Sequence, residues 1–294
     1  MNSFSIWWLA IRPKTLSISI TPVLLGSALA WHDQQIFSPL IFCIILLSAL
    51  CIQIGTNLYN DAADFEKGAD TTERLGPKRA AQQGWLSAKQ IKTGAMLSFI
   101  IAFIAGIYLA WLGGIAIIIL GLLSILCGYA YTAGSKPIAY SPFGELFVLI
   151  FFGICAVGGT YYLQTQNLSS ISLLIASGLG SIAAAILLVN NYRDLEGDEK
   201  VNKLTLVHYA GRPTSRLIYS FMIIFPYLLL FSLPLLQETY SWMILFPLLS
   251  IPLAIKVIQL LYTLEISSKL NIVLVKTAKL QVIYTLLLSI GLII

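Results

Sequence analysis

Residues 38–64 read SPLIFCIILLSALCIQIGTNLYNDAAD. The first part of this stretch is apolar and long enough to cross a membrane as one helix, because the hydrocarbon core of a bilayer requires about 20 apolar residues. The stretch then ends in amides and carboxylates. A second stretch, NNYRDLEGDEK at 190–200, follows another apolar run in the same way. Both stretches predict membrane helices that end in polar groups.

The composition of the whole chain supports this interpretation. Of 294 residues, 58% are hydrophobic and only 11% are charged, whereas a soluble domain has about 25% charged residues. Every backbone polar group in lipid must be hydrogen-bonded within the protein, so the apolar runs predict a helical bundle. The runs are long and lack the alternation of membrane β-strands. We therefore expect an all-α integral membrane protein in which residues 1–294 form a single transmembrane domain.

The apolar runs divide into nine predicted membrane spans. Only Leu112, Gly113 and Gly114 separate the third span from the fourth, so totals of eight or ten remain open. The predicted spans are 15–31, 38–58, 93–111, 114–132, 145–163, 171–191, 216–236, 240–261 and 271–294.

The basic residues predict the orientation of the nine spans. All 18 Lys and Arg residues fall on one side of a nine-span arrangement, in the N-terminal tail and in every second loop. Positive residues concentrate in cytoplasmic loops. We therefore expect the N-terminus and the loops around both polar stretches to face the cytoplasm. The corresponding location is the inner (cell) membrane of a bacterium.

Topology does not explain the acidic residues, which gather in the two polar stretches. If the helix that begins near residue 38 continues to residue 64, then Asn57, Asp61 and Asp64 lie within about 60° of one another around its axis. The later helix presents a matching set, in which Asn191, Asp194 and Asp198 lie within a similar arc and Asn190 lies beside them. That set comprises Asn190, Asn191, Asp194 and Asp198.

Both sets lie at helix C-termini, which carry partial negative charge, so carboxylates there are unfavourable unless a cation neutralises them. Oxygen ligands of this kind suit Mg²⁺, which usually binds one or two carboxylates together with substrate phosphates. Nearby basic side chains can bind the remaining phosphate oxygens. The alternative is that both stretches are solvated loops without a ligand. The candidate phosphate-binding residues are Arg74, Lys78, Arg79 and Lys136.

A diphosphate site inside an apolar bundle suggests a substrate with a long apolar chain, such as an isoprenyl diphosphate. NDAAD and DLEGD resemble the N-D-x-x-D and D-x-x-x-D motifs of the UbiA superfamily of intramembrane aromatic prenyltransferases. Further stretches resemble the branch of that superfamily that prenylates 1,4-dihydroxy-2-naphthoate in menaquinone or phylloquinone synthesis. The resemblance covers the first seven predicted spans, and the last 75 or so residues add only hydrophobicity. The further stretches are IRPKTLSISITPVLLGSALA, ERLGPKRAAQQGWLS, YTAGSKPIAYSPFGE and NKLTLVHYAGR.

The resemblance implies a bundle around a central cavity with Mg²⁺ as the cofactor. Many members carry a third acid four residues after the second Asp of the first motif, where this chain has Gly68, so Asp70 is a candidate in its place. Glu196 would point away from Asp194 on a continuous helix. The implied catalytic residues are Asp61, Asp64, Asp194 and Asp198. The implied metal ligands are Asn60, Asp61, Asp64, Asp70, Asp194 and Asp198. The implied substrate-binding residues include Asn57, Asn60, Asn190 and Asn191.

The reaction implied by the resemblance is an electrophilic aromatic substitution. The diphosphate leaves, the electron-rich ring attacks the allylic carbon, and the ring carboxylate is lost as CO₂. Tyr131, Lys136 and Tyr140 lie near the cytoplasmic end of the fourth span and are candidates for contacts to the acceptor or the diphosphate. An equally open alternative is that these tyrosines are interfacial anchors.

Two other functions remain open from the sequence. Another member of the superfamily would use a different acceptor, such as 4-hydroxybenzoate or homogentisate. An ion-coupled transporter would also contain acids within membrane spans, although such acids lie near the bilayer midplane. The expected partners are a polyprenyl diphosphate, an aromatic acceptor and membrane lipid, with no nucleic acid. The sequence does not predict the prenyl chain length or the oligomeric state.

Overall fold

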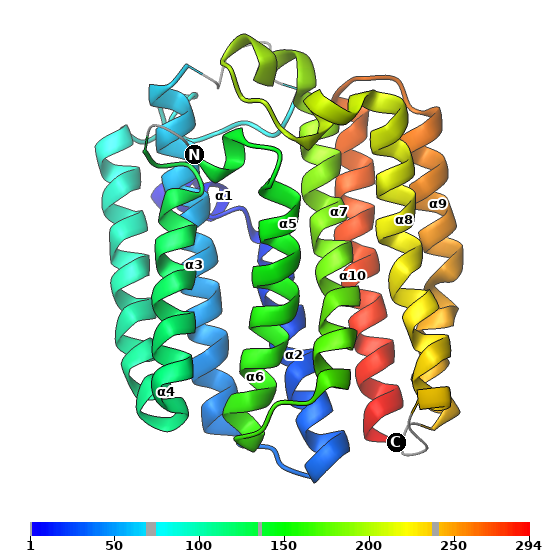
Figure 1. Cartoon of the computed structure of the whole chain (residues 1–294). Helices are drawn as coiled ribbons and strands as arrows, with labels where there is room; N and C mark the ends of the chain where they lie inside the picture. Colours follow the sequence, from blue (N-terminus) through cyan, green and yellow to red (C-terminus); the bar gives the residue numbers. More distant parts are fainter. Residues whose placement is uncertain (1, 69–74, 135–136, 237–240) are drawn as a thin grey trace.

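A computed structural model of the chain describes residues 2–68, 75–134, 137–236 and 241–294. Within these ranges all regular structure is helical, as the composition predicts. Figure 1 shows the long helices side by side in one bundle, with the two chain termini at opposite ends. The elements are α1 (Ser3–Ala10), α2 (Pro13–Gln34), α3 (Pro39–Glu66), α4 (Ala88–Ala130), η1 (Ile138–Tyr140), α5 (Gly144–Leu149), η2 (Ile150–Cys155), α6 (Ala156–Thr165), α7 (Ser170–Lys200), α8 (Leu206–Leu236), η3 (Trp242–Ser250), α9 (Ile251–Thr263), η4 (Ser268–Leu270) and α10 (Asn271–Ile293).

The longest helix, α4, is a hairpin of two membrane-crossing arms. A straight helix of its 43 residues would be about 65 Å long, about twice the thickness of the hydrocarbon core. Gly114 has φ 62° and ψ −152°, and the chain reverses there (Figure 1). Both arms contact Tyr59. Its hydroxyl donates a hydrogen bond to Tyr129 of the second arm at 3.3 Å, and the centre of its ring lies 6.0 Å from Nζ of Lys92 in the first arm. The break predicted at residues 112–114 is confirmed.

With α4 counted as two arms, the described residues contain nine membrane-crossing segments, as predicted. As continuous helices, eight are long and apolar enough to cross a membrane. The segment predicted to begin at residue 216 starts at Leu206 in the structure, because α8 includes a short turn before a break at Gly211. The segment predicted to begin at residue 240 starts with the 3₁₀ turns of η3 at Trp242.

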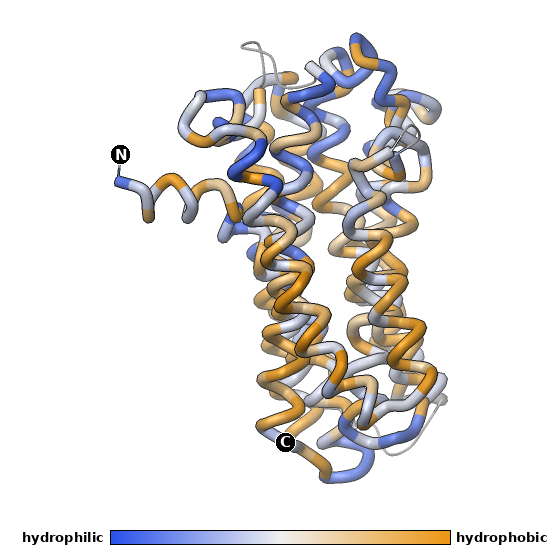
Figure 2. The backbone as a smooth tube through the Cα atoms, turned by 90° about the vertical axis from the view of Figure 1, so that its left-hand side faces the viewer, coloured by the Kyte–Doolittle hydropathy of each residue, from blue (hydrophilic) through white to orange (hydrophobic). Residues whose placement is uncertain are grey.

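The outer surface of the bundle is largely apolar, as expected for a membrane protein. Large apolar side chains are exposed along the helices, among them Ile104 (61%), Trp111 (78%) and Leu217 (64%). Figure 2 shows a hydrophobic middle between two more polar ends, and the end opposite the C-terminus is the more polar of the two. Helix α1 projects sideways near this end, with Trp8 exposed.

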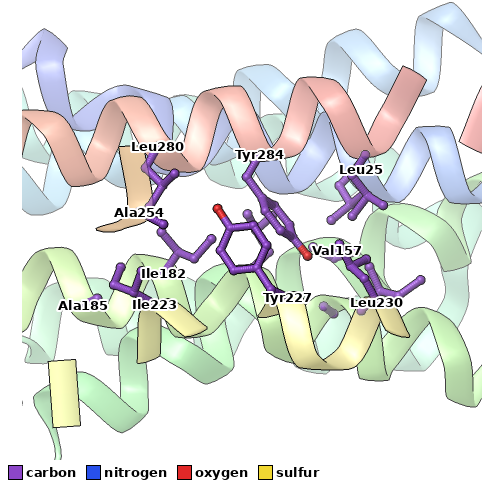
Figure 3. Close-up of a cluster of buried hydrophobic side chains, with 14 of the residues drawn as sticks. Leu25, Val157, Ile182, Ala185, Ile223, Tyr227, Leu230, Ala254, Leu280 and Tyr284 are labelled. Carbon is purple, nitrogen blue, oxygen red and sulfur yellow. The ribbon is translucent and has the colours of Figure 1, made fainter. Parts of the chain in front are cut away.

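The largest buried cluster joins α7, α8 and α10 with the helices beside them (Figure 3). The rings of Tyr227 and Tyr284 pack edge to face with their centres 5.4 Å apart. Buried hydroxyl groups need hydrogen-bond partners, and these have them: Tyr227 bonds Ser250 at 2.6 Å, and Tyr284 donates to the Pro226 carbonyl at 3.2 Å. The cluster fixes α7, which carries the second polar motif, relative to α10.

The span from α5 to α6 contains a π-helical segment, η2, that packs closely against α7. A side chain at Gly180 of α7 would begin only 2.4 Å from the Leu149 carbonyl oxygen and 2.9 Å from Gly153 Cα, so only glycine fits there. Single π-helical turns inside α-helices are frequent at functional sites. Here the segment turns Phe151 and Phe152 toward a cavity within the bundle.

Candidate functional site

A cavity of about 350 Å³ extends between the helices and has a polar end and an apolar interior. We call its polar residues, which belong to both motifs and their surroundings, the polar end. Such a cavity suits a ligand with a charged head and an apolar chain. The polar end comprises Arg12, Asn57, Asn60, Asp64, Arg79, Asn190, Asn191 and Lys203. The apolar interior includes Val23, Ile45, Leu109, Ile117, Leu120 and Leu163.

Asp64 is the carboxylate of the first motif that faces this cavity. It is only 3% exposed, and it accepts hydrogen bonds from Arg79 Nη1 at 3.0 Å and from the Tyr140 hydroxyl at 3.2 Å. Arg79 also donates to Asn60 Oδ1 at 2.9 Å. Burial, and then the negative charge of Asp64, raise the pKa of Tyr140 above its ordinary value, so its phenol stays protonated and donates to Asp64.

Asp61 makes a different contact from the one that the predicted stripe implies. It is 1% exposed and accepts hydrogen bonds from the backbone N–H groups of Ala80 at 3.0 Å and Ala81 at 3.4 Å. It lies about 40° around the helix axis from Asn57, and the connection that carries Arg79 folds onto that side. Asp61 therefore holds the backbone beside Arg79, and its role as a metal ligand remains a prediction.

Lys203 connects the second motif to the first. Its Nζ lies 3.1 Å from Asp198 Oδ2 and 5.9 Å from the centre of the Tyr140 ring. Because Tyr140 is hydrogen-bonded to Asp64, a continuous series of contacts links Asp64 to Asp198. The two motifs, about 130 residues apart in sequence, therefore adjoin one cavity.

Asp194 is held by Arg193, whose side chain is completely buried. Arg193 donates to both Asp194 oxygens at 2.7 and 2.5 Å, to Asn190 Oδ1 at 2.9 Å and to Asn271 Oδ1 at 2.5 Å. Asn271 in turn donates to the Leu75 carbonyl at 3.0 Å. The expectation that the last residues add only hydrophobicity is therefore wrong, because α10 begins with a residue that joins the two motif regions.

Arg12 is a residue of the polar end that the sequence indicates only as one of the charges that set the topology. It donates to Asn60 Oδ1 at 3.0 Å. Its φ of 54° places a non-glycine residue in the left-handed region, which costs energy and marks a constrained position. No sequence pattern indicated this conformation, although Pro13 directly after it disfavours the helical alternative. Lys203 was missed in the same way.

The remaining predicted residues fall into three groups. Asn57 donates to the Ile11 carbonyl at 3.0 Å and to Thr15 at 3.1 Å, and it lines the cavity with Tyr131. Lys78 is exposed at the surface. Glu196 pairs with Arg212 and points away from Asp194, as expected for a continuous helix. Three predicted residues lie outside the described residues: Asp70, Arg74 and Lys136.

The oxygen donors of this site fit Mg²⁺ that shares its coordination with a substrate. In the described part of the chain, no group of three Asp, Glu, His or Cys side chains is arranged to hold a metal alone. Mg²⁺ typically uses one or two carboxylates and completes its shell with water and phosphate oxygens. Asp64, Asn60 and Asn190 line the cavity, and Asp198 contacts Lys203, which also lines it. Together they supply such an incomplete set.

Comparison with known sequences identifies relatives of the chain. The model of the UbiA prenyltransferase family matches residues 19–279. A 1,4-dihydroxy-2-naphthoate octaprenyltransferase of Haemophilus influenzae is 36% identical over 300 residues, covering 100% of this chain and 97% of that protein. The protein with the same name from Bacillus subtilis is 33% identical and covers 98% of this chain and 92% of its own length. The match includes α10, beyond the seven spans of the predicted resemblance.

Solved structures show the same fold. A UbiA homolog from Archaeoglobus fulgidus, bound to DMAPP and Mg²⁺, superposes with a TM-score of 0.68 at 12% identity, covering 98% of this chain and 99% of that chain. An apo UbiA homolog from Aeropyrum pernix K1 gives a TM-score of 0.67 at 15% identity. At such low identity the agreement demonstrates the fold, and the predicted helical bundle is confirmed.

Proposed function

The chain belongs to the UbiA prenyltransferase family, and on this premise we propose that it transfers a polyprenyl group from an isoprenyl diphosphate to 1,4-dihydroxy-2-naphthoate with loss of CO₂. The observation that carries this proposal is the 36% identity over the full chain to a relative named for this acceptor. The cavity supports it, because a polar end with two motifs adjoins an apolar interior. Family membership makes the chain a prenyltransferase and decides against the transporter alternative.

The diphosphate of the prenyl donor binds at the polar end. Arg12, Arg79 and Lys203 line the cavity there and can donate charge-assisted hydrogen bonds to phosphate oxygens. Bound Mg²⁺ would neutralise negative charge that develops on the departing diphosphate. Asp64, Asp194 and Asp198 would hold it with the amide oxygens of Asn60 and Asn190.

The prenyl chain lies in the apolar interior, where residues of α2, α3, α4 and α6 supply aliphatic side chains. Phe147, Phe151 and Phe152 line the same cavity from α5 and η2. Their rings exclude water from the allylic carbon as its bond to the diphosphate breaks, and the faces of aromatic rings attract a cation. The ring of the acceptor then forms the new carbon–carbon bond, and its carboxylate leaves as CO₂.

An acceptor panel tests the proposed function. Membranes that contain the protein are incubated with Mg²⁺, a polyprenyl diphosphate and one acceptor at a time, and products are identified by mass spectrometry. We expect decarboxylated prenyl naphthoquinol from 1,4-dihydroxy-2-naphthoate and at least tenfold lower rates from 4-hydroxybenzoate and homogentisate. A faster reaction with either of these would assign the chain to the other acceptor class.

We also propose that the polar end opens to the cytoplasm of a bacterial cell. The one-sided distribution of Lys and Arg supports this orientation. On a background without the native cysteines, Gln83→Cys and Leu168→Cys place single thiols at exposed positions near opposite ends of the bundle. A membrane-impermeant maleimide should label Leu168→Cys in intact cells and Gln83→Cys only after lysis. Labelling of both thiols from outside would contradict the arrangement.

A further inference from the structure

Glu145 is a buried carboxylate that the mechanism above does not use. It is 2% exposed, at the beginning of α5. Its Oε1 accepts a hydrogen bond from Asn191 Nδ2 at 2.8 Å. Among the described residues, nothing donates to its Oε2. Burying a carboxylate while one of its oxygens accepts no hydrogen bond costs free energy. The presence of Glu145 at this position therefore requires an explanation.

The contact fixes the orientation of the Asn191 amide. A carboxylate only accepts hydrogen bonds, so Asn191 must turn its NH₂ group toward Glu145. The carbonyl oxygen Oδ1 then points elsewhere, and within the described part of the chain no group donates to it. Asn191 is 3% exposed and lines the cavity. The cavity wall therefore contains an amide with a free acceptor oxygen that is held in one orientation.

The surroundings of Asn191 suit an aromatic ring that carries hydroxyl groups. Tyr131 lines the cavity, and its phenol oxygen lies 3.9 Å from the point where a side chain on Gly144 would begin. Phe147 and Phe151 stack with their ring centres 6.0 Å apart and an interplanar angle of 15°, and both line the cavity. The wall thus offers flat apolar surface from α5 and η2 and a hydrogen-bond acceptor from α7, the helix that packs against both.

The position of Asn191 also suits the aromatic acceptor rather than the prenyl donor. Its neighbour Asn190 belongs to the polar end and is bonded to Arg193, the partner of Asp194. A ring held at Asn191 would therefore lie next to the diphosphate end of the donor, where the new bond forms. The prenyl chain itself has no hydroxyl group to donate to Asn191.

We propose that Glu145 is a positioning residue that orients Asn191, so that Asn191 Oδ1 accepts a hydrogen bond from a ring hydroxyl of the aromatic acceptor. The proposal rests on the proposed function for the existence of a hydroxylated acceptor. It assigns the acceptor to the corner formed by α5, η2 and α7 and the prenyl chain to the apolar interior.

The test compares the dihydroxy acceptor with its two mono-O-methyl ethers, each of which lacks one donor. In the wild-type enzyme we expect the KM of one ether to be about tenfold higher, the size of one net hydrogen bond. In Glu145→Leu and Asn191→Leu, the KM of the dihydroxy acceptor should rise about tenfold. The KM of that ether should then lie within about twofold of the KM of the dihydroxy acceptor. A merely structural role would leave the difference between the two ligands unchanged.

Glu145→Gln is the conservative control. Its amide oxygen can still accept from Asn191 Nδ2, so its KM should stay within about threefold of the wild-type value. Binding of inorganic diphosphate with Mg²⁺, measured by thermal shift, should be unchanged in both Glu145 variants and shows that they are folded. A cooperative thermal unfolding transition shows that Asn191→Leu is folded. A loss in Glu145→Gln as large as in Glu145→Leu, or full discrimination against the ether in both leucine variants, would overturn the proposal.

The experiment also separates this proposal from the proposed function. If the wild-type enzyme does not prenylate 1,4-dihydroxy-2-naphthoate, the proposed acceptor is wrong. The same comparison is then made with the acceptor that the panel identifies and its methyl ether. If the wild-type KM is the same for that acceptor and its methyl ether, the role of Asn191 is wrong even though the acceptor is known.

Discussion

Asp64→Asn should reduce prenyl transfer by more than tenfold while the protein remains folded in the membrane. Asparagine has the shape of aspartate. Its single carbonyl oxygen can still accept from Arg79, and its NH₂ group can donate to the Tyr140 hydroxyl, where Arg79 and Tyr140 contact Asp64 at 3.0 and 3.2 Å. Asparagine lacks the negative charge with which Asp64 would bind the Mg²⁺ at the diphosphate. Loss of a ligand that stabilises the transition state should cost more than the 1.4 kcal/mol that corresponds to one tenfold step. The measurement is kcat at saturating donor, acceptor and Mg²⁺.

Glu66→Gln is the matched control for Asp64→Asn. Glu66 belongs to the same acidic cluster and the same helix, but its side chain is 48% exposed and pairs with Lys92 at 2.6 Å at the surface. An exposed ion pair of this kind contributes at most about 1 kcal/mol to stability, and we expect kcat within twofold of the wild-type value. More than a tenth of wild-type activity in Asp64→Asn would count against the metal assignment.

The membrane-crossing segments could be predicted because they depend on one-dimensional properties. A span requires about 20 apolar residues, and the paired glycines at 113–114 interrupt a run that is too long for one span. The face of α3 that carries Asn57 and Asp64 followed equally from the helical period. Helical periodicity therefore placed both residues on one helix face, and in the structure both line the cavity.

The partners of these side chains could not be predicted, since they come from segments distant in sequence. Asp61 lies on the predicted face, but the connection at residues 79–81 folds over it, and backbone N–H groups of that connection donate hydrogen bonds to both of its carboxylate oxygens. Helical periodicity gives a direction and does not say which segment lies there. Arg12 depends on a left-handed backbone conformation that no local pattern required.

The importance of α10 illustrates the same limit. Its sequence is an apolar span like any other, and only its first residue, Asn271, reaches the site. A single asparagine at a helix start ordinarily indicates a cap. Its contact with Arg193 depends on how α10 packs against α7, which arises from the buried cluster in Figure 3. Predictions from sequence could therefore recover both motifs but not the residue that joins them.

Arg193→Met should destabilise the protein by about 3–5 kcal/mol, the cost of removing one partner from a buried ion pair. The guanidinium is completely buried and donates four hydrogen bonds, to Asp194, Asn190 and Asn271. Methionine fills a similar volume but donates none, so the Asp194 carboxylate loses its closest cation in an interior that cannot solvate it. The measurement is the free energy of unfolding in mixed detergent micelles, with prenyl transfer assayed in parallel.

Arg212→Met separates the effect of burial from the effect of losing an arginine. Arg212 also pairs with a carboxylate of α7, Glu196, but their side chains are 25% and 60% exposed, so water can replace the lost partner and we expect about 1 kcal/mol or less. Arg193→Lys should lie between the two, because lysine keeps the charge but cannot span three acceptors in one plane. If Arg193→Met unfolds at the same free energy as Arg212→Met, then Arg193 does not hold the two motif regions together. The joining of α7 to α10 would then rest on apolar packing alone.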